Sequence, residues 1–147
     1  MAFIDVDEVG DYFANISNRV GTTGNKDDVL LVQALLEVIY KGKVWNPVRH
    51  ITVTGIPASD TIILIKYFQK TVLNRKNPQG YVNRSSGQNT DYSTIWKLNR
   101  NAELSLGVPS ILAYLRAKSP ILKASLPPML DTPKNLDPDF PIPAYIR

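Results

Sequence analysis

The stretch that most constrains the fold is residues 51–69, ITVTGIPASDTIILIKYFQ, in which a turn leads directly into a helix. Gly55 supplies the backbone freedom that a tight turn needs, and Pro57 fixes the next bend. Ser59 or Asp60 can cap the N–H groups of the first helical turn. The apolar residues after Asp60 recur at helical spacing over a broad face, which predicts a helix that is buried on most sides.

A second, strongly periodic helix is predicted ahead of this stretch, over residues 27–42, DDVLLVQALLEVIYKG. Its aliphatic residues recur at i, i+3 and i+4 and form one face that can be buried. Asp27 or Asp28 is the expected N-cap, and Gly42 lies just past the last turn, where helices commonly stop.

The pattern of residues 53–69 partly repeats over residues 81–99. The second copy has a Ser-Ser-Gly turn at residues 85–87 in place of the first glycine turn, and a further apolar helix begins at Thr94. Neither copy can bury its apolar face alone. We therefore expect a mainly α fold, in which the leading helix and the two repeats form a three-helix bundle with short extended linkers.

About residues 20–99 resemble the small three-helix peptidoglycan-binding domains. The residues that match the family motif, and that we expect to be structural, are Val29, Gln33, Leu36, Val53, Gly55, Thr61, Phe68, Gln69, Val82, Gly87, Thr94, Leu98 and Asn99. Two departures stand in the first turn. Thr54 occupies the position where the family usually has Asp, and Ala58-Ser59 occupies the position where Gly-Pro is common.

The segments on either side complete the predicted organisation. The predicted parts are an N-terminal helical arm (1–19), the peptidoglycan-binding-like helical domain (20–100), an additional short helix (101–125) and a Pro-rich extended tail (126–147). A weak apolar pattern predicts a helix near Asp7–Asn18 in the arm. The tail is too apolar for a plain linker, so it is expected to dock on its own domain, on a second subunit or on a partner protein.

Composition excludes several classes of function. The 147 residues include no cysteine and one histidine, and the net charge is +4. Disulfides and thiolate metal sites are therefore impossible, and a nucleophile–histidine pair would have only His50 to use. We expect no enzyme, no cofactor and no metal site. The mild positive charge suits an anionic partner, but nucleic-acid binding is not expected because no such motif accompanies it.

Location is also bounded by the sequence. No window approaches the roughly 20 apolar residues that a membrane span needs. The acidic N-terminal residues do not form a signal peptide. We therefore expect synthesis in the cytoplasm and, where the protein reaches the periplasm or the cell envelope, export by a dedicated apparatus.

The resemblance implies a non-catalytic binding module that recognises cell-wall peptide or glycan. The ligand surface is expected at Arg49, His50, Ile56, Ser59 and Tyr81, with Arg49 pairing with a stem-peptide carboxylate. The alternative is a structural or adaptor component of a contractile injection apparatus, such as a bacterial type VI secretion system or a phage-like tail. In that role the same fold would make protein–protein contacts, and the tail could form an oligomer.

Overall fold

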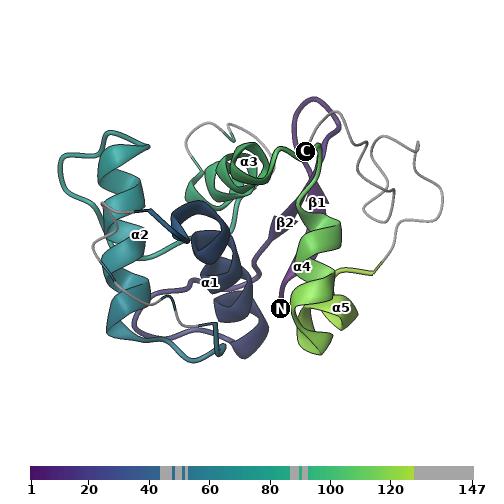
Figure 1. The fold of residues 1–147 in the computed structure, drawn as a ribbon, viewed down its shortest axis with the longest axis horizontal. Coiled ribbons are helices and arrows are strands. Elements are labelled where there is room, and N and C mark those ends of the chain that lie inside the picture. The colour runs from purple at the N-terminus through teal and green to yellow at the C-terminus, as the bar shows by residue number, and fades with distance from the viewer. Residues whose placement is uncertain (44–47, 49–50, 52, 87–89, 91–92, 128–147) are drawn as a thin grey trace.

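The structure, a computed structural model, is mainly helical with one small sheet (Figure 1). It describes residues 1–43, 48, 51, 53–86, 90 and 93–127. The elements in chain order are β1 (Phe3–Val6), β2 (Tyr12–Asn15), α1 (Lys26–Tyr40), α2 (Ser59–Thr71), α3 (Thr94–Leu106), α4 (Leu112–Lys118) and α5 (Pro120–Ser125). The predicted helical class is confirmed. The Pro-rich tail lies outside the described residues, apart from Leu126 and Pro127.

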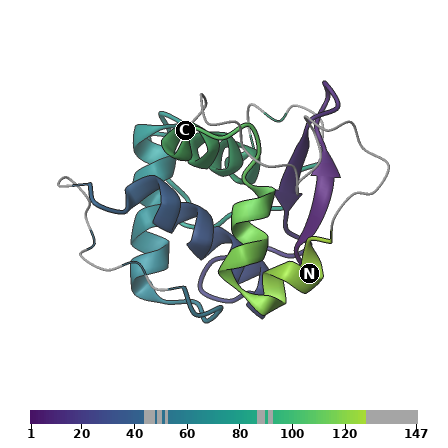
Figure 2. The ribbon, with the colours of Figure 1, turned by 45° about the vertical axis from the view of Figure 1, so that its right-hand side comes forward.

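Helix α1 lies at the centre of the fold. It packs against α2, α3, α4 and α5, and every residue from Asp28 to Leu36 is buried. Figures 1 and 2 show α2 on one side of α1 and the two strands with α4 and α5 on the other. The prediction that α2 is buried on most sides is wrong. As an outer helix it buries one face and leaves Ile63 47% exposed.

The N-terminal segment is a β-hairpin, so the predicted helix near Asp7–Asn18 is wrong. Strands β1 and β2 pair in antiparallel register, with Phe3 opposite Asn15. The Asp7 carboxylate accepts hydrogen bonds from the backbone N–H groups of Val9 (3.1 Å) and Asp11 (2.9 Å). A carboxylate that binds backbone two and four residues on stabilises a turn and competes with helix formation.

Asp27 and Asp28 do not cap α1, in contrast to the prediction. Asn25 is the N-cap residue, and its side chain makes no capping hydrogen bond. Asp27 instead accepts from the backbone N–H of Ala2 at 2.7 Å, and Asp28 accepts from that of Ser17 at 3.3 Å. Both carboxylates lie in the first turn, where negative charge is favourable, and they fasten the N-terminal segment to α1.

Ser59 and Asp60 do not cap α2 in the predicted way either. The N-cap is Ala58, and its side chain makes no capping bond. Helix α3 continues to Leu106, past the predicted domain end at Arg100. The short helix predicted beyond it is present as α4, and it ends at Ser119. A second helix that was not predicted, α5, follows, because Ser119 also caps it by accepting from the N–H of Ile121 at 3.1 Å.

Gln33 of α1 binds the turn that precedes α2. Its Oε1 accepts from the backbone N–H groups of Thr54 and Gly55, each at 2.9 Å. Its Nε2 donates to the carbonyl of Ile56 (3.0 Å) and to the hydroxyl of Thr61 (3.1 Å). Gly55 has φ +80°, and a Cβ there would lie 3.0 Å from a backbone oxygen of α1. We call these five residues the Gln33 cluster.

Gln69 of α2 repeats this arrangement at the segment that precedes α3. Its Oε1 accepts from the N–H groups of Gln79 (2.9 Å) and Gly80 (3.1 Å). Its Nε2 donates to the carbonyl of Tyr81 (2.8 Å) and to the hydroxyl of Thr94 (3.4 Å). Gly80 has φ +76°, like Gly55 in the first cluster. These five residues form the Gln69 cluster.

The two clusters fix the register of the internal repeat, which differs from the sequence-based one. The counterpart of Gly55 is Gly80 and not the Ser-Ser-Gly turn at residues 85–87, because Gly80 donates to the second glutamine. Tyr81 is therefore the counterpart of Ile56. Gly87 itself lies outside the described residues.

The remaining motif residues are mostly structural, as expected. The fully or almost fully buried apolar ones are Val29, Leu36, Phe68, Val82 and Leu98. Val53 is partly buried and packs against the core. Asn99 of α3 is a third buried amide, which accepts from the N–H of Ala14 (2.8 Å) and donates to its carbonyl (2.9 Å). This exchange attaches β2 to α3.

Replacing Gln33 or Gln69 with Ala should lower the free energy of unfolding by about 3 kcal/mol, since backbone groups of a buried turn lose their partners. Urea denaturation of the purified chain measures the loss. Lys70→Ala is the matched control, because Lys70 is an exposed neighbour of Gln69 and its loss should change stability by less than about 0.5 kcal/mol. Equal effects for Gln69→Ala and Lys70→Ala would refute the structural role of the cluster.

Candidate functional site

Of the predicted ligand residues, Tyr81 lies at a pocket. Ile56 is 66% exposed and Ser59 is also exposed, but neither lines the two pockets that surround Tyr81. Arg49 and His50 lie outside the described residues. The structure therefore does not bring Ile56 and Ser59 together with Tyr81 in one pocket.

Two shallow pockets flank Tyr81. The α3-side pocket has a volume of about 240 Å³, and its polar side chains include Arg75, Arg84, Ser86 and Ser93. The α2-side pocket has a volume of about 360 Å³, and its polar side chains include Arg19, Thr22, Thr23 and Lys66. Gln79 and Tyr81 line both pockets. We call the two pockets with these two shared residues the Tyr81 surface.

The Gln69 cluster positions the Tyr81 surface. Gln69 binds only the backbone of Gln79, Gly80 and Tyr81. The side chains of Gln79 and Tyr81 contact two of the cations instead, because Gln79 accepts from Arg75 and the Tyr81 ring lies against Arg19. A Cβ on Gly80 would lie 2.8 Å from Cε of Lys66. The glycine therefore leaves room for the Lys66 side chain to lie across the turn.

The Tyr81 surface is basic. Each pocket is lined by two cationic side chains, and no Asp or Glu is among the described residues that line either one. The guanidinium of Arg19 lies 4.0 Å from the centre of the Tyr81 ring, and its Nε donates to Oδ1 of Asn83 at 2.8 Å. A ring and an amide orient the guanidinium without neutralising it. The surface is therefore suited to binding an anionic or hydroxyl-rich ligand.

Thr54, at the position where the family usually has Asp, has a local role. Its Oγ1 accepts from the backbone N–H of Ile56 at 3.2 Å. This hydroxyl contact stabilises the first turn in the way that an Asp side chain can, although more weakly. The substitution is therefore compatible with the turn of the Gln33 cluster.

The fold also brings two carboxylates together, at a place away from the Tyr81 surface. Arg100 binds Asp7 at 3.1 Å and Glu103 at 2.7 Å, and the indole of Trp96 donates to Asp7 at 3.1 Å. The second oxygen of Glu103 accepts from the backbone N–H of Ile111 at 3.0 Å. These contacts join the hairpin turn, α3 and the start of α4, which is a structural arrangement.

The pKa values of the two carboxyls move in opposite directions. Burial acts to raise the pKa of Asp7, but hydrogen bonds from backbone N–H groups, Trp96 and Arg100 outweigh it, so the pKa lies below its usual value. Burial raises the pKa of Glu103, although Arg100 opposes the shift. Neither residue lines a pocket of the Tyr81 surface, so nothing in this arrangement assigns them an acid–base role.

The sequence did not single out the four cations of the Tyr81 surface. Arg19 precedes α1, Lys66 lies within α2, and Arg75 and Arg84 lie between α2 and α3. No spacing in the sequence brings them together. The signal that could have found them is the register of the repeat, since it places Gly80, and not residues 85–87, at the second turn.

Other kinds of site are not seen in the described part of the chain. Its residues hold no group of three or more His, Cys, Asp or Glu side chains that could bind a metal ion. Among the described helices, none is both long and apolar enough to cross a membrane. Comparisons with protein-family models, curated proteins and solved structures find no match for this chain. The Tyr81 surface is the candidate functional site.

Asp7→Asn should destabilise the protein at pH 7, and the deficit should shrink near pH 2. The lowered pKa of Asp7 means that its contribution is present above the unfolded value of about 3.9 and is lost as the pH falls through the folded value. The opposite contribution of Glu103 is present in both proteins. Urea denaturation at the two pH values measures the difference.

The control for this measurement is Asp11→Asn, which removes an exposed carboxylate from the same hairpin. It should change stability little at either pH. A deficit for Asp7→Asn that stays constant between pH 7 and pH 2 would contradict the assigned role of the Asp7 charge.

Proposed function

We propose that the chain is a non-catalytic binding module that recognises the peptide or glycan of the bacterial cell wall. The observation that carries the proposal is the position of Tyr81, a residue expected from the sequence to contact ligand, between two basic pockets. The Gln69 cluster uses only the carbonyl of Tyr81. The guanidinium of Arg19 lies over the Tyr81 ring, so the ring and the guanidinium together would contact the ligand. The resemblance to peptidoglycan-binding domains supplies the class of ligand.

The side chains of the Tyr81 surface match the groups that such a ligand offers. An aromatic ring can pack against the apolar face of a sugar or a peptide side chain. Hydroxyl side chains such as Thr22 and Ser86 can exchange hydrogen bonds with hydroxyl and amide groups. Guanidinium groups such as those of Arg19 and Arg84 can pair with carboxylates. The surface is open and shallow, as fits part of a long polymer.

The finer architecture forms part of the same proposal. We assign α1, α2 and α3 to a bundle of the peptidoglycan-binding type, in which each of the first two helices contributes one glutamine cluster. The hairpin, α4 and α5 are additions that cover the other side of α1. Delivery to the envelope by a dedicated export apparatus is the matching expectation for location.

A second candidate is an adaptor of a contractile injection apparatus, and the outer side of α2 favours it. Ile63 on this helix and Ile56 on the turn before it are 47% and 66% exposed. A contiguous exposed apolar patch can mark a protein–protein contact, and in this candidate Ile56 and Ile63 would belong to such a patch. This candidate would use Ile56 and Ile63, and the wall-binding candidate would use Tyr81.

Tyr81→Ala should weaken co-sedimentation with insoluble peptidoglycan sacculi by about fivefold or more, because Tyr81 lines both pockets. Ile56→Ala is the matched control, because Ile56 occupies the equivalent position of the other cluster and lines neither pocket. Both residues serve their clusters through the carbonyl, so both variants should fold. Binding is measured at low and at moderate salt.

The outcomes separate the two candidates. Salt-resistant binding that Tyr81→Ala weakens and Ile56→Ala does not would support wall recognition. Binding that disappears at moderate salt and that Tyr81→Ala and Ile56→Ala change equally would reflect the net positive charge alone and would contradict the proposal. Absence of binding at both salt concentrations would also refute it, and a protein partner that depends on Ile56 and Ile63 would then be sought.

A further inference from the structure

We propose that the two pockets of the Tyr81 surface are paired oxyanion subsites that bind one ligand at two negatively charged groups. One group would lie beside Arg19 and Lys66, and the other beside Arg75 and Arg84, with Tyr81 between them. The inference rests on the proposed function and deepens it, because it names the chemical feature of the ligand that the surface recognises.

The distribution of charge supports two subsites. The four cations are divided equally between the pockets, two in each, and Tyr81 lines both pockets. No Asp or Glu is among the described residues that line either pocket. Each pocket also has hydroxyl donors, such as Thr22 on one side and Ser93 on the other. Cations with neighbouring hydroxyl donors are suited to the oxygens of a carboxylate or a phosphate.

Three of the four cations, all arginines, contact other side chains before any ligand binds. The guanidinium of Arg19 stacks 4.0 Å from the centre of the Tyr81 ring, and that of Arg84 lies 4.9 Å from the centre of the Phe3 ring. Arg75 donates to the side-chain oxygen of Gln79 at 3.1 Å. Side chains that are already ordered lose less conformational entropy on binding, which favours affinity.

Two neighbouring subsites that share Gln79 and Tyr81 imply that binding is divalent. Once one anionic group is bound, the second group is held near its own subsite, so its effective concentration is high. Affinity should therefore depend on both subsites at once and on both anionic groups of the ligand. Among wall components, a peptide with two carboxylates has this property, and we take such a peptide as the ligand.

In the experiment, the full chain is titrated with a triglutamate peptide, and calorimetry measures the affinity. A triglutamine peptide of the same length, whose side chains carry no charge, is the control ligand. Lys66→Gln removes a cation from the α2-side pocket, and Arg84→Gln removes one from the α3-side pocket. Each should weaken triglutamate binding by about fivefold or more. Triglutamine should bind much more weakly than triglutamate.

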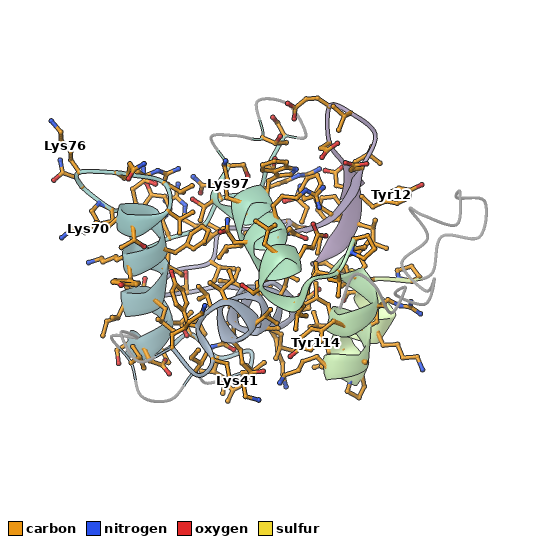
Figure 3. All side chains as sticks on the ribbon, turned by 45° about the horizontal axis from the view of Figure 1, so that its top comes forward. Tyr12, Lys41, Lys70, Lys76, Lys97 and Tyr114 are labelled. Carbon is orange, nitrogen blue, oxygen red and sulfur yellow. The ribbon has the colours of Figure 1, made fainter. Side chains whose placement is uncertain are left out.

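The controls are Lys70→Gln and Lys76→Gln, which each remove one positive charge from an exposed residue outside the Tyr81 surface. Neither residue lines a pocket, and Figure 3 shows both side chains at the outer edge of the molecule, near one end of α2. Both controls should bind triglutamate with nearly the affinity of the unmodified chain. Equal losses in the controls and in the pocket variants would overturn the proposal, because the binding would then be diffuse charge attraction.

The other possible outcomes also test the inference. If only one of Lys66→Gln and Arg84→Gln lowers the affinity for triglutamate, the subsites are not paired and the inference is overturned. Tripolyphosphate serves as a second probe. If it binds the unmodified chain, if Lys66→Gln and Arg84→Gln each weaken that binding, and if triglutamate does not bind, then the paired subsites stand and phosphate is their ligand group. Binding of neither probe would overturn the inference.

A parallel sacculus assay separates this inference from the proposed function. Sacculi that bind the chain while neither soluble probe binds would leave wall recognition in place without the paired subsites. If a soluble probe binds, Lys66→Gln and Arg84→Gln each weaken that binding, and sacculi do not bind, the paired subsites stand and wall recognition is refuted.

Discussion

The fold depends on two buried glutamine side chains that satisfy the backbone of two tight turns. A turn with a positive-φ glycine leaves successive N–H groups and a carbonyl without partners in regular structure, and burial of such groups is costly unless they are hydrogen-bonded. A primary amide has two acceptor lone pairs and two donor hydrogens, so one side chain can satisfy the whole turn. Gln33 and Gln69 each use all of this capacity.

These contacts fasten the elements to one another in chain order. Gln33 on α1 fixes the start of α2, Gln69 on α2 fixes the start of α3, and Asn99 on α3 fixes β2. Asp27 and Asp28 on α1 then hold the segments before and after the hairpin. Side-chain hydrogen bonds therefore connect α1 to α2, α2 to α3, α3 to β2, and the segments beside the hairpin to α1. The apolar core fills the space between them, with α1 buried at its centre.

Periodic patterns in the sequence predicted the helices, because helix formation depends mainly on residues that are close together in the chain. Helical periodicity located α1, α2 and α3, and the motif resemblance identified Gln33 and Gln69 as structural. The hairpin was missed because a weak apolar spacing was given more weight than the local bonds from the N–H groups of Val9 and Asp11 to Asp7, which form the turn. The register of the second turn was missed because the sequence does not show which glycine donates its N–H to Gln69. The cations of the Tyr81 surface could be assembled only after that register was known.

The glutamine clusters have a consequence for how such a surface can change. Each cluster takes its side-chain amide from a helix and only backbone atoms from the residue that follows the turn glycine. Ile56 and Tyr81 occupy equivalent backbone positions, yet one is aliphatic and the other aromatic. Single substitutions can therefore change the side chain at either position and leave the backbone contacts of its cluster unchanged. A duplicated unit of this kind allows one copy to diversify while the other remains as it was.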